Sequence, residues 1–374
     1  MAKSRTSAAP LYLRVKQGLL DRVRSGKYAA GQQIPTTAEL CRQFSVSSIT
    51  VRRAVQELTA EGVLSGRAGK GLFVRGDAAR NGDRLVGLVI PDLASNPFFG
   101  AMLQGIEARL SPAGYRLLIG ISGNEPDREC EVVRDFLGRS LDGLIITPVV
   151  HRRAPATVEL LREAVAARLP VVFLDRRLPN LAADYAGSNN QEGGYQATAY
   201  LLERGHRRVG FVYALDANTV QDRLRGYRQA LADAGVAFVP SLVRGGAGEE
   251  LGYDGAGKKH ALELLRAAAV PTAILTCSDA IALGVYDACR QLGLRIPQDV
   301  SVIGYDDLPY GPWCTPALTT VHQSQLQIGE TAADLLLARI ENRDACAREV
   351  LLQTHLVERE SCATVEIERK ARIA

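Results

Sequence analysis

The chain has no long apolar run and no paired cysteines. None of its 374 residues belongs to a stretch of the roughly 18 apolar residues that span a bilayer, and the N-terminus lacks the apolar core of a secretion signal. The seven cysteines are scattered and never form a C-x-x-C pair. We therefore expect free thiols in a reducing, cytoplasmic setting, with no disulfide framework, zinc site or membrane contact.

Signature motifs of the common enzyme classes are also absent. The segment Gly66–Gly71 has the wrong spacing for a P-loop, and no G-x-G-x-x-G opens a helix after a strand. No G-x-S-x-G nucleophile elbow occurs, and the five histidines show no metal-ligand spacing. The sequence thus predicts no enzyme activity, no cofactor and no metal.

Charge divides the chain into a small basic head and a larger acidic body. Residues 1–76 contain 13 Lys and Arg against 4 Asp and Glu, whereas the remainder contains 32 against 37. This asymmetry is typical of a protein whose head alone meets a polyanion, although a basic head can also serve solubility only.

Helix and turn signals lie close together between Gly31 and Val74. Thr36 and Glu39 form a capping box, and Gly62 is placed to end a later helix. Three glycines between two short apolar segments predict a tight hairpin. The predicted helices of the head span residues 11–25, 37–44 and 47–61, and the β segments span 63–64 and 72–74.

The third predicted helix turns hydroxyl and guanidinium groups outward near its N-terminus, and the hairpin adds cations beside glycines. Such groups suit phosphates and the base edges of a major groove. A solvated, charged helix beside an ordinary turn is the plainer reading. The candidate DNA-binding residues are Thr36, Thr37, Ser47, Ser48, Thr50, Arg52, Arg53, Arg67, Gly69 and Lys70.

Short motifs run through the head in a fixed order: Ile34-Pro35, Glu39-Leu40, Phe44-x-Val46-Ser47, Thr50-Val51-Arg52 and Gly69-x-Gly71-x-Phe73-Val74. Over residues 10–75 they resemble the winged helix-turn-helix of the GntR family of bacterial regulators. The resemblance implies that residues 47–61 form the recognition helix and that Arg52 contacts a base or a phosphate. Ala38 and Ser48 stand where many members carry polar or basic residues, which implies an operator read by fewer side chains.

From Leu85 onward, apolar strands alternate with helices. This alternation predicts parallel sheets covered on both faces, and seven such units suggest two doubly wound α/β sheets with a crevice at the carboxyl ends of the strands. An eight-stranded barrel is the alternative. The predicted strands span residues 85–90, 115–120, 143–147, 171–174, 208–212, 273–276 and 300–305, and the helices 98–110, 127–140, 156–168, 190–204, 221–234, 252–266 and 279–292.

Polar side chains follow several of these strands. Asp175, Ser278 and Asp306 come directly after or near strand ends, and Arg223 lies near the start of a helix. Carboxylates accept hydrogen bonds from hydroxyl groups and a guanidinium donates in a fork, so the set suits a polyhydroxylated ligand. For each residue alone, a helix cap or a buried ion pair is the plainer reading.

Two aromatic residues and two further carboxylates complete the candidates. Phe98 and Phe99 are placed to stack on the apolar face of a sugar ring or a base. Asp279 and Asp307 fit the pattern of helix caps better than that of ligand contacts.

Long motifs of the body include VGLVIPDLASNPFF, LDGLIITP, PVVFLDR, RLRGYRQAL and PTAILTCSDAIALGV. From about residue 84 to 360 they resemble the effector-binding region of the LacI/GalR family, which is related to periplasmic sugar-binding proteins. The resemblance implies that Asp175, Arg223, Ser278 and Asp306 line a cleft with Phe98 and Phe99 near its mouth. Ser278 replaces the usual Asn, and Ala247 stands nearest the position of the usual stacking aromatic.

The combined resemblance, similar to arabinose-responsive repressors, implies a homodimeric repressor of sugar-utilisation genes. It would bind double-stranded operator DNA and respond to a small carbohydrate. A regulator that responds to a purine or nucleoside, or a constitutive DNA-binding protein with a non-responsive body, are the alternatives. The expected parts are a head (1–76), a linker (77–83), an effector-binding domain (84–365) and a tail (366–374). Its two subdomains are expected at 84–187 with 320–347, and at 188–319 with 348–365.

Overall fold

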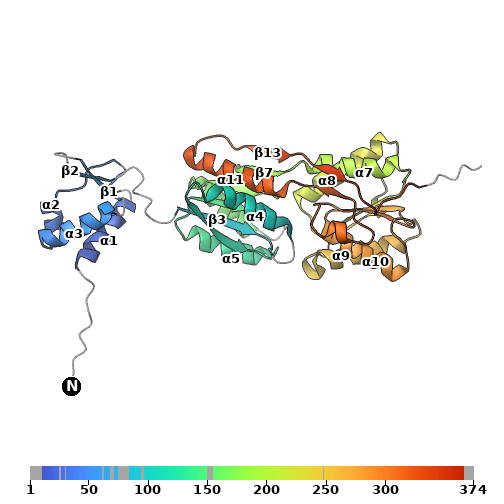
Figure 1. The fold of residues 1–374 in the computed structure, drawn as a ribbon, viewed down its shortest axis with the longest axis horizontal. Coiled ribbons are helices and arrows are strands. Elements are labelled where there is room, and N and C mark those ends of the chain that lie inside the picture. The colour runs from blue at the N-terminus through green and yellow to red at the C-terminus, as the bar shows by residue number, and fades with distance from the viewer. Residues whose placement is uncertain are drawn as a thin grey trace, which may run out of the picture. The chain divides into compact units, whose positions relative to one another are not determined.

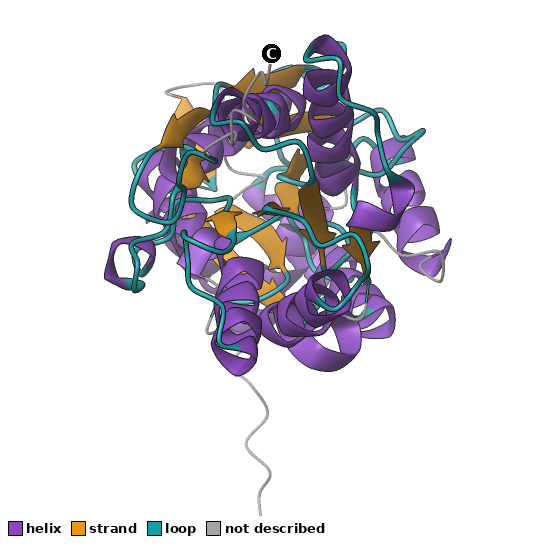
Figure 2. Ribbon diagram, turned by 90° about the vertical axis from the view of Figure 1, so that its right-hand side faces the viewer, coloured by secondary structure: helices purple, strands orange, loops and turns teal. Residues whose placement is uncertain are grey.

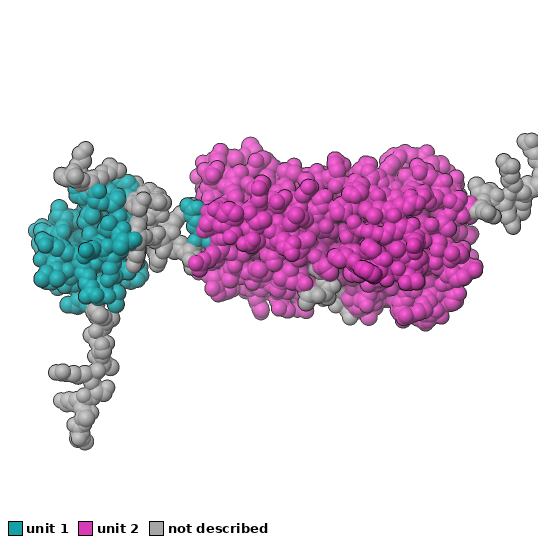
Figure 3. All heavy atoms as spheres, viewed as in Figure 1, with its two compact units in different colours: residues 1–84 teal, residues 85–374 magenta. Residues whose placement is uncertain are grey.

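The computed structural model divides the chain into two compact units, residues 1–84 and 85–374 (Figure 3). The expected linker (77–83) and tail (366–374) lie outside the described residues. Those that the structure describes are residues 11–24, 27–29, 31–60, 63–67, 71–74, 84–93, 97–149, 155–246 and 248–365.

The first unit is a winged helix-turn-helix, as predicted (Figure 1). Ser45, in the left-handed conformation, ends one helix and turns the chain toward the next. Leu40, Val51 and Leu58 are fully buried between the helices, which explains their helical spacing. Its elements are α1 (Leu11–Arg24), α2 (Thr37–Phe44), α3 (Ser48–Ala60) and the antiparallel pair β1 (Leu64–Arg67) and β2 (Gly71–Val74).

The second unit begins with a six-stranded sheet in the order β13-β7-β6-β5-β3-β4. Four of its neighbouring pairs, from β13 to β3, are parallel, and β5 and β6 are wholly buried. The strands are β3 (Arg84–Ile90), β4 (Tyr115–Ile121), β5 (Gly143–Ile146), β6 (Val171–Leu174), β7 (Asp184–Ser188) and β13 (Glu349–Leu352). The helices of this subdomain are α4 (Pro97–Leu110), α5 (Pro126–Leu137), α6 (Pro155–Ala166) and α11 (Gln325–Glu341).

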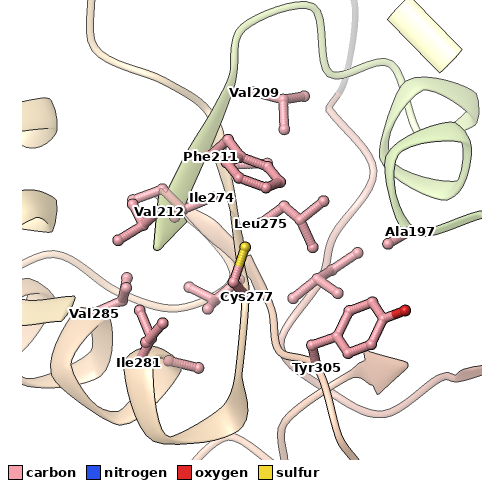
Figure 4. Packing of buried hydrophobic residues seen from close by; sticks show 14 of the residues in the cluster. Ala197, Val209, Phe211, Val212, Ile274, Leu275, Cys277, Ile281, Val285 and Tyr305 are labelled. Atoms are coloured by element: carbon pink, nitrogen blue, oxygen red, sulfur yellow. The ribbon is translucent and has the colours of Figure 1, made fainter. Parts of the chain in front are cut away.

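A separate parallel sheet, ordered β11-β10-β8-β9, forms the centre of the second subdomain. Phe211 and Tyr305 are buried in its core beside Cys277 (Figure 4). Two sheets with helices around them (Figure 2) confirm the predicted doubly wound fold and exclude the single barrel. The strands are β8 (Val209–Tyr213), β9 (Val243–Gly245), β10 (Ala273–Thr276) and β11 (Ser301–Ile303). The helices are α7 (Asn190–Glu203), α8 (Asn218–Asp233), α9 (Gly248–Leu265) and α10 (Asp279–Leu292), with 3-10 turns η2 (Pro240–Leu242) and η3 (Gly311–Trp313).

The chain crosses between the subdomains near β12 (Thr320–His322) and β14 (His355–Val357), which pair antiparallel. The expectation that residues 348–365 belong wholly to the second subdomain was wrong, because β13 pairs in parallel with β7 in the first sheet. The expected placement of 320–322 in the first subdomain also needs correction, since His322 bridges to Asp306 of the second.

No helix within the described ranges combines the length and the apolar character needed to cross a bilayer. The seven cysteines are all free thiols. No group of three or more possible metal ligands comes together among the described residues.

Candidate functional site

The six residues expected to contact a ligand line one cavity between the subdomains. Its volume is about 50 Å³, enough for a few water molecules. Asp175 follows β6 of the first subdomain, and Asp306 follows β11 of the second. The lining includes Phe98, Phe99, Asp175, Arg223, Ser278 and Asp306, together with Arg176, Thr219, Tyr253 and Cys277.

Arg223 is the central cation of this cavity and is only 6% exposed. Its Nε donates to Oδ1 of Asn190 at 2.8 Å, and its Nη1 donates to the carbonyl oxygen of Cys277. The guanidinium carbon lies 3.7 Å from the centre of the Tyr305 ring. Burial alone lowers the pKa of Arg223, but Tyr305 and Asp306 more than offset this, so the group remains charged.

The two carboxyl groups near Arg223 are held in unfavourable surroundings. Burial raises the pKa of Asp175, with Arg176 and then Arg223 opposing the rise, and burial raises the pKa of Asp306 well above its ordinary value. Their backbones have positive φ angles of 61° and 112°. Strain of this kind at non-glycine residues is typical of functional sites.

One buried acceptor in the cavity has no partner. Oδ1 of Asp175 is buried and receives no hydrogen bond from the described residues. Oδ1 of Asp306 accepts from Nε2 of Gln323 at 2.6 Å, and Oε1 of Gln323 likewise has no partner among those residues. Because buried polar atoms are normally hydrogen-bonded and Asp175 lines the cavity, its Oδ1 is a candidate acceptor for a group supplied by a ligand.

Several residues in or near the cavity were not identified from the sequence. Arg176 donates to Oδ1 of Asn124 at 2.7 Å and to the hydroxyl of Tyr253 at 3.2 Å. Tyr253 also lines the cavity and adds an aromatic ring that the sequence analysis did not identify. Ala247 lies outside the described residues. Arg176 directly follows Asp175, so its adjacency to a predicted strand end was the available signal, whereas Gln323 follows β12, which was not predicted.

Ser278, Asp279 and Asp307 have structural partners. The Ser278 hydroxyl caps α10 by accepting from the Ile281 amide at 3.2 Å, while the residue also lines the cavity. Asp279 accepts from the Leu308 amide and the Thr320 hydroxyl at 2.7 and 2.6 Å, and burial raises its pKa to about 7. Asp307 accepts from Arg359 at 2.6 Å and His322 at 2.9 Å. The latter two aspartates therefore connect segments of the body.

Several hydroxyl groups of the head serve first as helix caps. Thr36 forms the predicted capping box with Glu39, and the Ser47 hydroxyl lies 2.9 Å from that of Thr50. Thr37 is half-buried and Ser48 is exposed. The Arg67 side chain, Gly69 and Lys70 lie outside the described residues.

The two arginines of α3 differ in their surroundings. The Arg53 guanidinium stacks 4.0 Å from the Tyr12 ring centre and lies 3.8 Å from Glu57, whereas Arg52 is exposed. Ile49, at 77% exposure, is a candidate that sequence reasoning missed. An apolar side chain beside a cation suits a thymine methyl group in a major groove.

A winged helix-turn-helix joined to a two-subdomain body with a buried polar cleft defines a ligand-responsive transcription regulator. The family described as bacterial regulatory proteins, gntR family, matches residues 11–74, and the periplasmic binding protein-like domain matches residues 198–362. The chain belongs to the transcriptional repressors of the LacI/GalR type and carries a GntR-family head.

Individual relatives support this assignment. The ribose operon repressor of Haemophilus influenzae is 34% identical over 280 residues, which is 74% of this chain and 81% of that protein. The arabinose metabolism transcriptional repressor of Geobacillus stearothermophilus is 30% identical over 338 residues, covering 89% and 92%. The repressor PurR of Haemophilus influenzae is 30% identical over 83% of this chain and 92% of its own. These relatives are repressors and not enzymes.

A solved structure shows the same body. The LacI family regulator of Enterococcus faecium, with bound ribose, superposes with a TM-score of 0.63 and 27% identity, covering 76% of this chain and all of that one.

Replacing Arg223 by alanine should make stability depend more strongly on pH. Without the cation, the folded-state pKa values of Asp175 and Asp306 rise further, and a raised carboxyl pKa favours folding at acid pH and disfavours it as pH increases. The deficit in melting temperature relative to wild type should therefore grow from about pH 5 to pH 8.

Thermal melts of both proteins across this range measure the effect. Arg228→Ala is the matched control, since Arg228 is exposed on the same helix and stacks on Phe238. A deficit equally large at both pH values for Arg223→Ala would contradict the proposed charge coupling.

Proposed function

We propose that the protein represses sugar-utilisation genes and that a small carbohydrate bound in the cleft modulates its affinity for operator DNA. The unpartnered Oδ1 of Asp175, beside the cation of Arg223, carries this proposal. A ligand hydroxyl can donate to the carboxylate while another accepts from the guanidinium, so a polyol satisfies both. Phe98 at the same cavity suits the apolar face of a sugar ring.

Entry of the ligand requires the cleft to open. Ligand pockets usually enclose about 300 Å³ or more, whereas this cavity measures about 50 Å³. Rotation of the subdomains about the crossovers at β12 and β14 is the simplest way to enlarge it. A sugar that binds one arrangement better than the other then shifts the equilibrium by its differential affinity.

A purine or nucleoside is the second candidate ligand. Purine repressors are among the relatives, and the Tyr253 ring beside Arg176 suits an aromatic base. A constitutive regulator would bind neither class of compound.

Asp175→Asn should weaken sugar binding by about ten-fold or more, because a charged acceptor of hydroxyl hydrogen bonds contributes roughly 1.5–3 kcal/mol. The dissociation constants of both proteins are measured by calorimetric titration with ribose, arabinose and other pentoses and hexoses, and with hypoxanthine and adenosine. Asp216→Asn is the control, since Asp216 is exposed and bonded to Gln221. Binding of hypoxanthine alone would select the purine reading, and no binding at all would sink the effector proposal.

Arg52→Ala should lower operator affinity by about 1–3 kcal/mol while leaving the melting temperature unchanged, because Arg52 is exposed and its proposed partner is DNA. Arg53→Ala should instead lower the stability of the head, since it removes the contact with Tyr12. Gel shifts on an operator selected from random duplexes, with melts of both variants, measure the two effects. Unchanged affinity in Arg52→Ala would refute the recognition-helix assignment.

The proposed active form is a homodimer joined through the body. A groove of about 1150 Å³ in the second subdomain is lined by α9, α10 and the segment from Tyr310 to Pro316. Leu283 in its wall is 37% exposed, and Trp313 in the adjoining turn η3 is 85% exposed. Large apolar groups exposed near a groove are typical of interfaces, and two-fold symmetry would suit a palindromic operator.

Trp313→Asp should convert the dimer to a monomer at micromolar concentration, because a charge would have to be buried at the interface. Light scattering coupled to size exclusion measures the mass. Val239→Asp, at another exposed apolar site, is the control and should leave the dimer intact. A Trp313→Asp protein that is still dimeric would place the interface elsewhere.

A further inference from the structure

The amino ends of the parallel strands in the first sheet carry a group of arginines outside the effector cleft. Arg168 precedes β6, Arg343 follows α11, and Arg348 directly precedes β13. All three side chains are exposed. We call these three residues the basic edge.

Positive charge exceeds negative charge at the basic edge. Arg168 pairs with Asp344 at 3.2 Å, whereas Arg343 donates to the carbonyl oxygen of Arg168 at 3.3 Å and has no carboxylate partner among the described residues. Arg348 lies 3.9 Å from Asp184, whose two oxygens are already bonded by Arg339 at 2.8 and 2.9 Å. Among the described residues, the ion pairs of Arg168, Arg339 and Arg348 thus involve two carboxylates, those of Asp344 and Asp184, in a body that is acidic overall.

The surface at the basic edge is concave, and hydrogen bonds hold its backbone in place. A cavity of about 300 Å³ is lined by Arg168, Arg339 and Arg343 together with Leu169 and Cys346. Arg339 is 13% exposed, and besides Asp184 it bonds the carbonyl oxygens of Ala345 and Cys346. This fixes the loop that leads to Arg348, so the exposed guanidinium groups start from an ordered backbone.

The body begins at the edge of the sheet that carries the basic edge. The strand β3 starts at Arg84, and parallel pairing puts the amino ends of β3, β5, β6, β7 and β13 along one edge of the sheet. Nine residues separate Val74 of the head from Arg84. The basic edge therefore lies close in sequence to the head, at the edge of the sheet where the body begins.

We propose that the basic edge contacts the phosphate backbone of the DNA that the head has bound. Exposed guanidinium groups bind phosphate through paired N–H donors and release counterions from the duplex. The contact is independent of base sequence and adds affinity to the recognition by α3. It rests on the proposed function, since the head must first bring DNA within reach.

The same contact would couple the cleft to DNA. Gln325 at the start of α11 donates to the carbonyl oxygen of Asp306, and Gln323 donates to its carboxylate. The helix then runs for 17 residues, about 25 Å, to Arg339 and the basic edge. A ligand that contacts Asp306 would therefore displace α11, whose C-terminal end carries the proposed phosphate contacts. The effect of the ligand on DNA binding then does not have to pass through the linker.

The test compares salt dependence of DNA binding between full-length proteins. The double variant Arg343→Gln and Arg348→Gln should make the negative slope of log affinity against log salt shallower by about 1.8, since each lost phosphate contact removes about 0.9 from its magnitude. The effect should appear with random 40-bp duplexes as well as with the selected operator. The control double variant Arg208→Gln and Arg225→Gln removes two exposed arginines of the second subdomain and should leave the slope unchanged.

Melts and sugar titrations of both double variants establish that they fold and bind ligand. A slope equal to that of the control would overturn the proposal. A second result would also overturn it: the salt slopes of the two double variants are equal, and inorganic phosphate or ribose 5-phosphate raises the melting temperature of wild type but not of the basic-edge variant. The basic edge would then bind small anions and not DNA. If wild-type protein bound no duplex at all, the proposed function itself would fail, and this outcome is distinct from equal slopes.

Discussion

The body depends on the buried positive charge of Arg223. Asp175 and Asp306 lie in surroundings that oppose their ionisation, and Arg223 is the neighbour from α8 that counters this for both. Asp175 belongs to the first subdomain, whereas Arg223 and Asp306 belong to the second. One charge therefore favours the ionised form of carboxyl groups on both walls of the cleft. A ligand that binds there replaces some of the interactions among these groups with hydrogen bonds of its own. It therefore acts directly on the interaction between the subdomains.

The sequence predicts the strands that are apolar throughout. β5 and β6 are wholly buried and were visible as continuous runs of aliphatic residues. β7, with the sequence DYAGS, was not predicted, although all five of its residues are buried. Its Asp184 is tolerated inside because Arg339, 155 positions later, pairs with it. A local pattern contains no information about such a distant partner, and this is why the strand was missed.

The same limit applies to the site. Asp175, Ser278 and Asp306 followed from the rule that ligands bind at the carboxyl ends of parallel strands, whereas Phe98, Phe99 and Arg223 were assigned to the cleft by the resemblance to the LacI/GalR family. Tyr253 was not identified, because the chain breaks within α9 at Gly252, where φ is 72°, and this turn sets which later residue reaches the cavity. In the head, Thr36 and Arg53 fitted the chemistry of DNA contacts, but local caps and the Tyr12 ring already engage them. Residue chemistry identifies candidates, whereas competing neighbours decide what each one is free to do.

The position of β13 has a consequence for biosynthesis. The second subdomain, from Asn190 to Thr319, is made as one uninterrupted stretch and can close its sheet as soon as that stretch leaves the ribosome. The first sheet starts earlier but finishes later, because α11 and β13 come from residues 325–352. Until then the edge of β7 has open hydrogen-bonding groups that can pair with other chains. The first subdomain, although its synthesis starts earlier, is thus the one that depends longest on chaperones. Truncations near the C-terminus should damage the sheet of the first subdomain before that of the second.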